Sequence, residues 1–541
     1  MLFNSSAFIL YFLPVCLAGF YALGLKGRQR LALAWLTVMS FVFYGWWNIW
    51  SVPLLAGSIL FNFFVGRHLA KTASKPVFLA GVAANVLLLG FFKYTGFVGT
   101  TVSDLLGLGW EVPEIALPLA ISFFTFQQIA FLADSYDGVA QEPKLLNYSL
   151  FITFFPHLIA GPITHHKEMI PQFDEPAIFR PRADLFSLGL TVFLAGLFKK
   201  VVIADGIALY ARPVFEAAVL GAEPTLFEAW GGALAYAMQM YFDFSGYSDM
   251  AIGLGLLFGI SLPLNFNSPY KAPSIIEYWQ RWHMTLTRFL TAYIYNPIVL
   301  AMTRRRLAAK KSVLRPGRTD LPAFVMLVAA PTIVTMFISG FWHGAGWQFI
   351  VFGLLHGAFL TVNHGWRMLK ARGGWSMPGP APLRHAASVL LTFLCATIAL
   401  VFFRSADLPS AVRIVAGMAG ANGVIVPFDV ANLAAGRAIV ALLGLETGEM
   451  ELFWIREVFW LALLFWIVWF MPNVAQWMRH YQTALAPKMR AIWYDRRALT
   501  DSPLAAWHPS VACGVIVGAI GITALLRTFS SAPSEFLYFQ F

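Results

Sequence analysis

Long hydrophobic runs alternate with short polar segments along most of this 541-residue chain. A helix of about 20 residues is about 30 Å long, which matches the hydrocarbon core of a bilayer. The runs far exceed the roughly 10-residue strands of a membrane barrel and do not alternate apolar with polar positions. The pattern therefore predicts an all-α, multi-pass membrane protein.

The runs predict roughly 11 to 14 membrane segments, some of them re-entrant. The good candidates are about 5–23, 31–48, 52–66, 77–92, 115–133, 185–203, 226–243, 322–341, 347–366, 384–403, 453–471 and 510–526. Shorter or broken runs lie at about 147–160, 205–220, 248–262 and 275–300. No basic segment precedes the first run, so we expect a retained helix there and not a cleaved signal.

Composition supports a membrane protein, since 59% of the residues are hydrophobic and only 12% are charged. A soluble domain carries about 25% charged residues, so a soluble enzyme, a secreted scaffold and a disordered chain are excluded. Cys16, Cys395 and Cys513 lie in apolar segments without a C-x-x-C motif. This spacing suggests neither a disulfide framework nor a thiolate metal site.

The net charge of +11 comes from basic residues between the apolar runs. Positive residues mark cytoplasmic loops, so membrane topology explains the charge better than nucleic-acid binding. A basic patch also attracts anionic lipids, and membrane lipids are therefore expected partners. The densest cluster comprises Arg304, Arg305, Arg306, Lys310, Lys311, Arg315 and Arg318.

This cluster and a second basic loop that begins at Arg367 flank two apolar runs. The two runs are predicted to form a hairpin whose turn, Ser339–Trp347, lies towards the extracytoplasmic side. The turn contains His343. A neutral imidazole there could accept a proton from a hydroxyl near pH 7, although a hydrogen-bonded core histidine remains an alternative. His356, in the next helix, is expected to be a packing or pore residue.

Two further polar clusters interrupt the apolar runs. Two prolines and a glycine break the segment 155–166, which is either a kinked span leading to a loop or the lining of a cavity. His165 and His166 resemble a metal-binding pair only superficially, because adjacent residues on a helix point differently. In 239–249, Asp243 and Asp249 suit acid–base chemistry, an ion path or the support of a helix break.

Glycines follow this second cluster at Gly253, Gly255 and Gly259. Without a preceding strand, they favour small-residue helix packing over a dinucleotide site. The chain as a whole suggests a core at 1–405, a mixed loop with short amphipathic pieces at 406–450, and C-terminal membrane helices at 451–541.

The stretch 264–297 combines a helix start with basic residues. Ser274 and Glu277 are spaced as in a capping box. The segment 278–288 is amphipathic, and on one continuous helix Arg281 and Arg288 would share a face. With Lys271, these arginines either neutralise a phosphate-bearing donor such as coenzyme A or snorkel at a membrane surface.

Five ordered motifs give the chain a family resemblance. They are Pro118–Asp134, Phe155–Phe173, Tyr241–Asp249, Leu262–Pro297 and Ile338–Gly357, and the tail Phe536–Phe541 adds to them. With these motifs the chain resembles the membrane-bound O-acyltransferase family, in particular its bacterial polysaccharide branch.

The resemblance implies a helical bundle around a central tunnel in the bacterial inner membrane. His343 matches the signature histidine of the family, and His283 matches a second polar position. The further residues implied to bind the donor or to line the tunnel are Asn265, Arg281, Arg288, Trp282, Trp342, Asp243 and Ser245. Neither a bound cofactor nor a metal is expected.

The implied reaction is acyl transfer, most simply of an acetyl group, from acyl-CoA or an acyl-carrier thioester in the cytoplasm. The acceptor is a hydroxyl of an extracytoplasmic polysaccharide, as in alginate O-acetylation, or a periplasmic SGNH-hydrolase-like acetyltransferase partner. His343 would act as general base, and His283 would orient the donor or stabilise the oxyanion; a covalent acetyl-imidazole is a variant. Teichoic-acid D-alanylation, peptidoglycan O-acetylation and a non-enzymatic glycan or lipid transporter remain alternatives.

Overall fold

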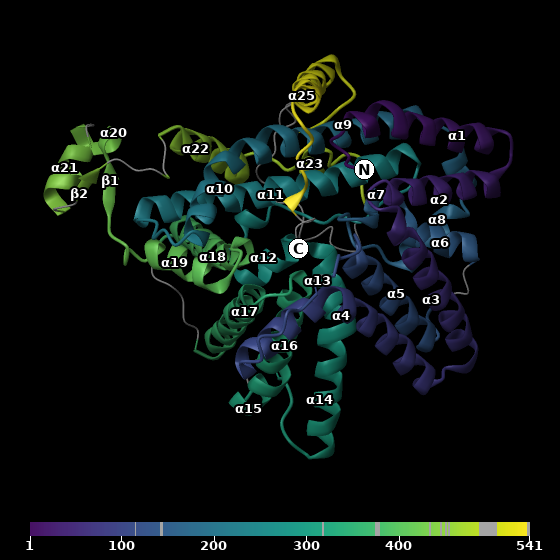
Figure 1. Ribbon diagram of the computed structural model, residues 1–541, viewed down its shortest axis with the longest axis horizontal. Coiled ribbons are helices and arrows are strands. Elements are labelled where there is room, and N and C mark those ends of the chain that lie inside the picture. Colours follow the sequence, from purple (N-terminus) through teal and green to yellow (C-terminus); the bar gives the residue numbers. More distant parts are fainter. Residues whose placement is uncertain are drawn as a thin grey trace. The chain divides into compact units, whose positions relative to one another are not determined.

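The computed structural model describes all residues except 114, 141–143, 316–318, 374–378, 432–433, 444–445, 449–451, 453–454, 486–505 and 538–541 (Figure 1). Arg318 of the basic cluster and the last four residues of the tail motif lie outside the described residues. In the described part, helices dominate, and the only strands are β1 (Ile425–Pro427) and β2 (Glu446–Gly448), which pair in parallel. The all-α prediction is confirmed.

The described chain groups into two units, each assembled from segments distant in sequence. The first comprises residues 1–202, 244–265 and 474–541, and the second comprises residues 203–243 and 266–473. The helix α11 (Leu226–Leu257) contributes to both. The division at residues 405 and 450 that the sequence suggests stays a prediction.

The first unit is built from helices that pack through aromatic side chains and glycines. Its helices are α1 (Leu13–Leu25), α2 (Gln29–Gly45), α3 (Val52–Thr72), α4 (Lys75–Leu106), α5 (Ile121–Tyr136), α6 (Leu145–Thr153), α7 (Phe155–Leu158), α8 (His166–Phe173), α9 (Ala183–Phe198), α23 (Val474–Trp477) and α25 (Val511–Ser530). Tyr247 stacks on Phe3 at 4.8 Å, and Phe536 of the tail meets its ring edge-on at 4.5 Å. These rings place residues from the start and the end of the chain in one core.

Glycines let α9 approach α11 closely. A Cβ atom on Gly253 would lie 2.5 Å from the carbonyl oxygen of Gly189, and one on Gly196 would lie 2.5 Å from that of Gly246. Only a missing side chain permits such backbone contact. The small-residue packing predicted for Gly253 is confirmed.

The second unit holds the remaining elements. They are α10 (Asp205–Val219), α12 (Ile275–Arg281), α13 (Met284–Leu290), α14 (Asn296–Ala308), α15 (Leu321–Phe324), α16 (Ala330–His343), α17 (Trp347–Gly373), α18 (Ala381–Arg404), α19 (Leu408–Met418), α20 (Phe428–Ala431), α21 (Ala434–Leu443), α22 (Ile455–Phe470) and the two strands. The short helices α19 to α21 lie in the region 406–450, and the amphipathic loop expected there stays a prediction. Single π-helical turns, including η6 (Thr291–Tyr295) and η7 (Val325–Ala329), join α13 to α14 and α15 to α16.

Eight helices in the described residues are long and apolar enough to cross a membrane. They are Phe8–Leu25, Ile49–Thr72, Lys75–Leu106, Ala183–Val219, Leu321–His343, Trp347–Gly373, Ala381–Arg404 and Val511–Ser530. Other apolar helices such as α2, α5 and α22 have 16 or 17 residues, which is short for a full span. The multi-pass prediction is confirmed. The sequence suggested about 11 to 14 membrane segments, and eight helices in the described residues have the length and hydropathy of a full span.

Candidate functional site

The hairpin of α16 and α17 positions His343. The two helices lie side by side (Figure 1) and are joined by the short turn Gly344–Gly346, which confirms the hairpin expected from the sequence. A Cβ atom on Gly340 would lie 2.3 Å from the carbonyl oxygen of Phe349, so this glycine lets the helices cross closely. His343 is the last residue of α16 and is buried.

Aromatic rings surround the imidazole of His343. The ring of Phe403, at the end of α18, meets it nearly edge-to-face with centroids 5.1 Å apart. Phe352 of α17 does the same at 5.9 Å, and the neighbouring Trp342 lies at 4.9 Å. Such rings fix the orientation of the imidazole in an apolar environment.

His283 lies at a break between two helices. The helix α12 begins at Ile275 and is capped by Ser274, whose hydroxyl accepts a hydrogen bond from the Glu277 amide at 3.3 Å as the capping box predicts. It ends at Arg281, Trp282 is extended, and His283 has the left-handed φ of +42°. For a residue with a Cβ atom this conformation is strained, and such strain often occurs at functional positions.

This break corrects one expectation. The sequence suggested that Arg281 and Arg288 share a face of one helix, but α12 ends at Arg281 and Arg288 belongs to α13. The prediction that the two arginines share one helix face is therefore wrong. The amphipathic pattern continues across the break, but the helix does not.

A continuous set of aromatic side chains connects His283 to His343. We call it the aromatic wall; it consists of Phe266, Trp282, Tyr278, His356 and Phe352. Its successive ring centroids lie 5.1, 5.7, 6.1 and 4.8 Å apart. The ring of His283 stacks on Phe266 at 6.5 Å at one end, and His343 meets Phe352 at the other. The second unit thus links two histidines that are 60 residues apart in sequence, from 283 to 343.

Phe266, Tyr278 and Phe352 of the aromatic wall were not among the predicted tunnel residues, whereas Trp282 was. Trp282 directly follows α12, and its amide still donates a hydrogen bond to the carbonyl oxygen of Tyr278 at 2.7 Å. This contact keeps the four-residue spacing that brings side chains together along a helix. The rings of Tyr278 and Trp282 are inclined by only 12°. His356 accepts a hydrogen bond at Nδ1 from the indole of Trp279 at 3.2 Å, so it does pack in the core as expected.

Basic side chains lie close to one end of the aromatic wall. Arg281 forms an ion pair with Glu277, and its buried Nε has no hydrogen-bond partner among the described residues. Lys271 donates a hydrogen bond from Nζ to the carbonyl oxygen of Met471 at 2.7 Å. Burial, assisted by the nearby Arg281 charge, lowers the pKa of Lys271 to about 8.

The other predicted site residues divide between the units. Asp243 is buried in the second unit, whereas Ser245 and Asn265 belong to the first. Asn265 donates a hydrogen bond to the hydroxyl of Ser248 at 3.2 Å, and the buried hydroxyl of Ser245 has no partner in the described part of the chain. The roles assigned to these three residues remain predictions.

The segment between α7 and α8 is irregular, as its prolines predict. α7 ends at Leu158 and α8 begins at His166. Gln127 of α5 donates a hydrogen bond to Thr164 of this segment at 2.9 Å, and its Nε2 lies 3.5 Å from Nδ1 of the buried His157. A Cβ atom on Gly161 would lie 2.4 Å from the Cα atom of His157, which explains the glycine.

Comparisons with known proteins identify the family. The sequence pattern of the MBOAT, or membrane-bound O-acyltransferase, family matches residues 103–314, a range that includes His283 and ends before His343. The chain is 41% identical over 454 residues to the peptidoglycan O-acetyltransferase of Helicobacter pylori, covering 78% of this chain and 81% of the relative. The chain belongs to the membrane-bound O-acyltransferase family.

Two other relatives carry different acceptors in their names. The chain is 36% identical to the "Probable alginate O-acetylase AlgI" of Azotobacter vinelandii, covering 77% of this chain and 78% of the relative. It is 26% identical to the teichoic acid D-alanyltransferase of Bacillus subtilis, covering 61% and 76%. The predicted enzyme class, a membrane O-acyltransferase, is confirmed, and it is favoured over a transporter.

Proposed function

We propose that this membrane O-acyltransferase transfers an acetyl group from a cytoplasmic thioester to a hydroxyl of a polysaccharide outside the bacterial inner membrane. The observation that carries the proposal is the aromatic wall, which connects His343 to the strained His283 within an acyltransferase. Both relatives with more than 30% identity described above are named as O-acetylating enzymes. Acetyl transfer is therefore preferred over D-alanyl transfer.

In the proposed reaction His343 is the general base. Its imidazole accepts the proton of the acceptor hydroxyl while the hydroxyl oxygen attacks the thioester carbonyl carbon. The carbon–sulfur bond then breaks, and the imidazolium returns the proton to the departing thiolate. His283 orients the donor or stabilises the negative charge on the carbonyl oxygen.

The donor is proposed to be acetyl-CoA or an acyl-carrier thioester. Lys271, Arg281 and Arg288 offer positive charges for its phosphate groups. The acceptor is either the polysaccharide itself or a periplasmic SGNH-hydrolase-like partner that completes the transfer. The second route applies if the acetylated intermediate is a protein hydroxyl.

Transfer can be measured with the purified protein in proteoliposomes. Radiolabelled acetyl-CoA is supplied on one side, and alginate or peptidoglycan fragments on the other, with and without a candidate periplasmic partner. We expect label on the acceptor and release of free coenzyme A in equal amounts. Movement of an intact glycan without consumption of the thioester would instead support the transporter.

Donor use should depend on pH through Lys271. The lowered pKa means that its ammonium is protonated below about pH 8 and neutral above it. The KM for acetyl-CoA should therefore rise roughly tenfold as the pH passes from about 7 to about 9, since a charge-assisted contact is lost. Lys271→Arg keeps its charge in this range and should remove the dependence. If the KM of the unmodified enzyme for acetyl-CoA is as independent of pH as that of Lys271→Arg, Lys271 does not contact the donor.

A further inference from the structure

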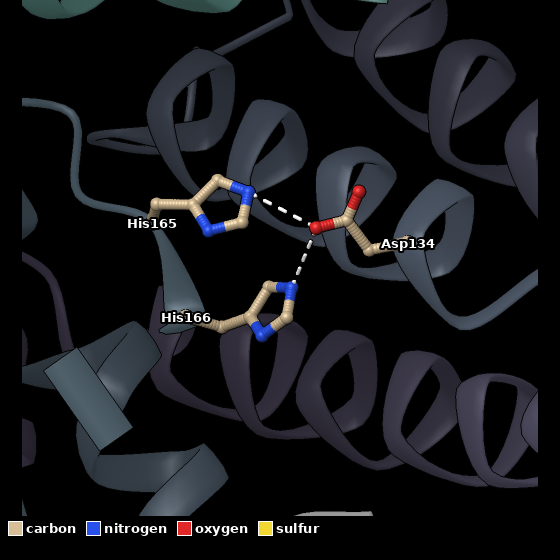
Figure 2. Close-up of side chains that lie close together, drawn as sticks. All are labelled: Asp134, His165 and His166. Carbon is tan, nitrogen blue, oxygen red and sulfur yellow. Dashed lines mark hydrogen bonds and ion pairs between the residues drawn. The ribbon is translucent and has the colours of Figure 1, made fainter. Parts of the chain in front are cut away.

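The first unit contains a second cluster of ionisable side chains that the transfer reaction does not use. Asp134, at the end of α5, faces His165 and His166 at the start of α8 (Figure 2). Both Nε2 atoms approach the same carboxylate oxygen, Oδ2, at 3.1 Å from His165 and 2.9 Å from His166. The two rings lie 4.6 Å apart and are inclined by 32°.

The backbone explains why adjacent histidines converge. The sequence-based argument against a pair assumed that both residues are helical, but His165 is extended, with φ −108° and ψ 137°. His166 is the first residue of α8. The turn from extended to helical backbone therefore directs both imidazoles to one point, and the premise of that argument does not hold.

We propose that Asp134, His165 and His166 bind a divalent first-row transition metal such as Zn²⁺. Two imidazoles and one carboxylate form a ligand set that such ions prefer over oxygen-only sites. Neighbouring ligand atoms around a tetrahedral Zn²⁺ are separated by roughly 3.3–3.6 Å, because each lies about 2.0–2.2 Å from the metal. The two nitrogen–oxygen distances of 3.1 and 2.9 Å are a few tenths of an ångström shorter, and all three ligand atoms lie within 4.8 Å of one another. Small side-chain movements therefore suffice to reach the spacing of a metal site.

Burial shields two of the three ligand side chains from solvent. The side chain of Asp134 is 12% exposed and that of His166 is 5% exposed, so little water competes for their ligand atoms. Metal binding uses the ionised carboxylate and neutral imidazoles. The side chain of His165 is 22% exposed, which leaves a path from water.

The ammonium of Lys167 would compete with a metal ion for the carboxylate of Asp134. Its Nζ lies 3.2 Å from Oδ2 of Asp134, and its side chain is 42% exposed, so it can move into solvent. Metal binding also requires His165 Nδ1, which now accepts the Lys167 amide at 3.3 Å, to carry the ring proton. The ion therefore displaces the lysine charge and one long hydrogen bond. Three protein ligands leave a coordination position for water or a small anion.

Binding is tested on the full-length protein in detergent, purified without a histidine tag and stripped with a chelator. Co²⁺ serves as a visible probe, and Zn²⁺ affinity follows from its displacement. We expect one equivalent per chain and a loss of at least about tenfold in affinity for His166→Ala and Asp134→Asn. Lys167→Met should instead tighten binding, because the competing charge is gone.

A matched control is the stacked histidine pair His480 and His508, whose ring centroids lie 5.1 Å apart. In the described residues, the Asp134 cluster is the only group of three side chains with metal-ligand spacing. The double variant H480A/H508A should therefore keep the binding. No saturable Co²⁺ binding, or binding that His166→Ala leaves unchanged, overturns the proposal. If the ligand variants fail to fold, unchanged affinity in Lys167→Met overturns it and tighter binding supports it.

Discussion

Replacement of His343 by alanine should abolish acetyl transfer while the protein still inserts into the membrane. A positioned general base contributes about 100-fold to 10,000-fold in rate, so activity should fall to near background. The side chain lies at the end of α16, after the helix crossing at Gly340, so its removal leaves that crossing intact. The measurement is the rate of label transfer in proteoliposomes, normalised to the amount of folded protein.

His385 is a suitable control because it is exposed near the start of α18, in the same unit. His385→Ala should transfer acetyl groups at the unmodified rate. Near-normal transfer by His343→Ala would remove His343 from the mechanism. Label trapped on the protein in the absence of acceptor would favour the covalent acetyl-imidazole variant.

The sequence predicted best those features that depend on nearby residues. The α16–α17 hairpin follows from two apolar runs between basic loops, with glycines at the turn. The start of α12 follows from the spacing of Ser274 and Glu277, because capping involves only one helical turn. Glycine contacts such as Gly189 with Gly253 also follow from composition, since membrane helices pack through small residues.

The break at His283 was not predictable from local signals. Neither glycine nor proline occurs between Arg281 and Met284. His283, with its left-handed φ, is buried and stacks on Phe266, which is a tertiary contact. The aromatic wall was unpredictable for the same reason, because tertiary contacts join its residues, from Phe266 to Phe352. A periodic pattern describes one helix face and does not reveal which distant ring packs on it.

Asp249 shows how a local pattern leaves a role open. The sequence allowed acid–base chemistry, an ion path or support of a helix break. In the structure its Oδ2 lies 2.6 Å from Nζ of Lys199, and the two side chains are only 11% and 13% exposed. The close approach of Gly196 and Gly246 brings their helices within reach. The partner lies 50 residues away in sequence, which no local rule identifies.

Asp249→Ala should therefore cause a large loss of stability. The substitution leaves the ammonium of Lys199 without this carboxylate in a buried position, and breaking one side of a buried ion pair typically costs about 3–5 kcal/mol. We expect a strongly lowered thermal unfolding midpoint and less folded protein in membranes. Size-exclusion profiles in detergent after heating at graded temperatures measure both effects.

The double variant K199M/D249L separates charge burial from packing. Replacing both partners by apolar side chains removes the uncompensated charge, so stability should recover to within roughly 1–2 kcal/mol of the unmodified protein. Arg212→Ala is a control, because Arg212 pairs with Glu216 on an exposed surface where ion pairs contribute little. If Asp249→Ala destabilises no more than Arg212→Ala, the pair does not stabilise the first unit. If the double variant is as unstable as Asp249→Ala, the loss comes from packing and not from the orphaned lysine charge.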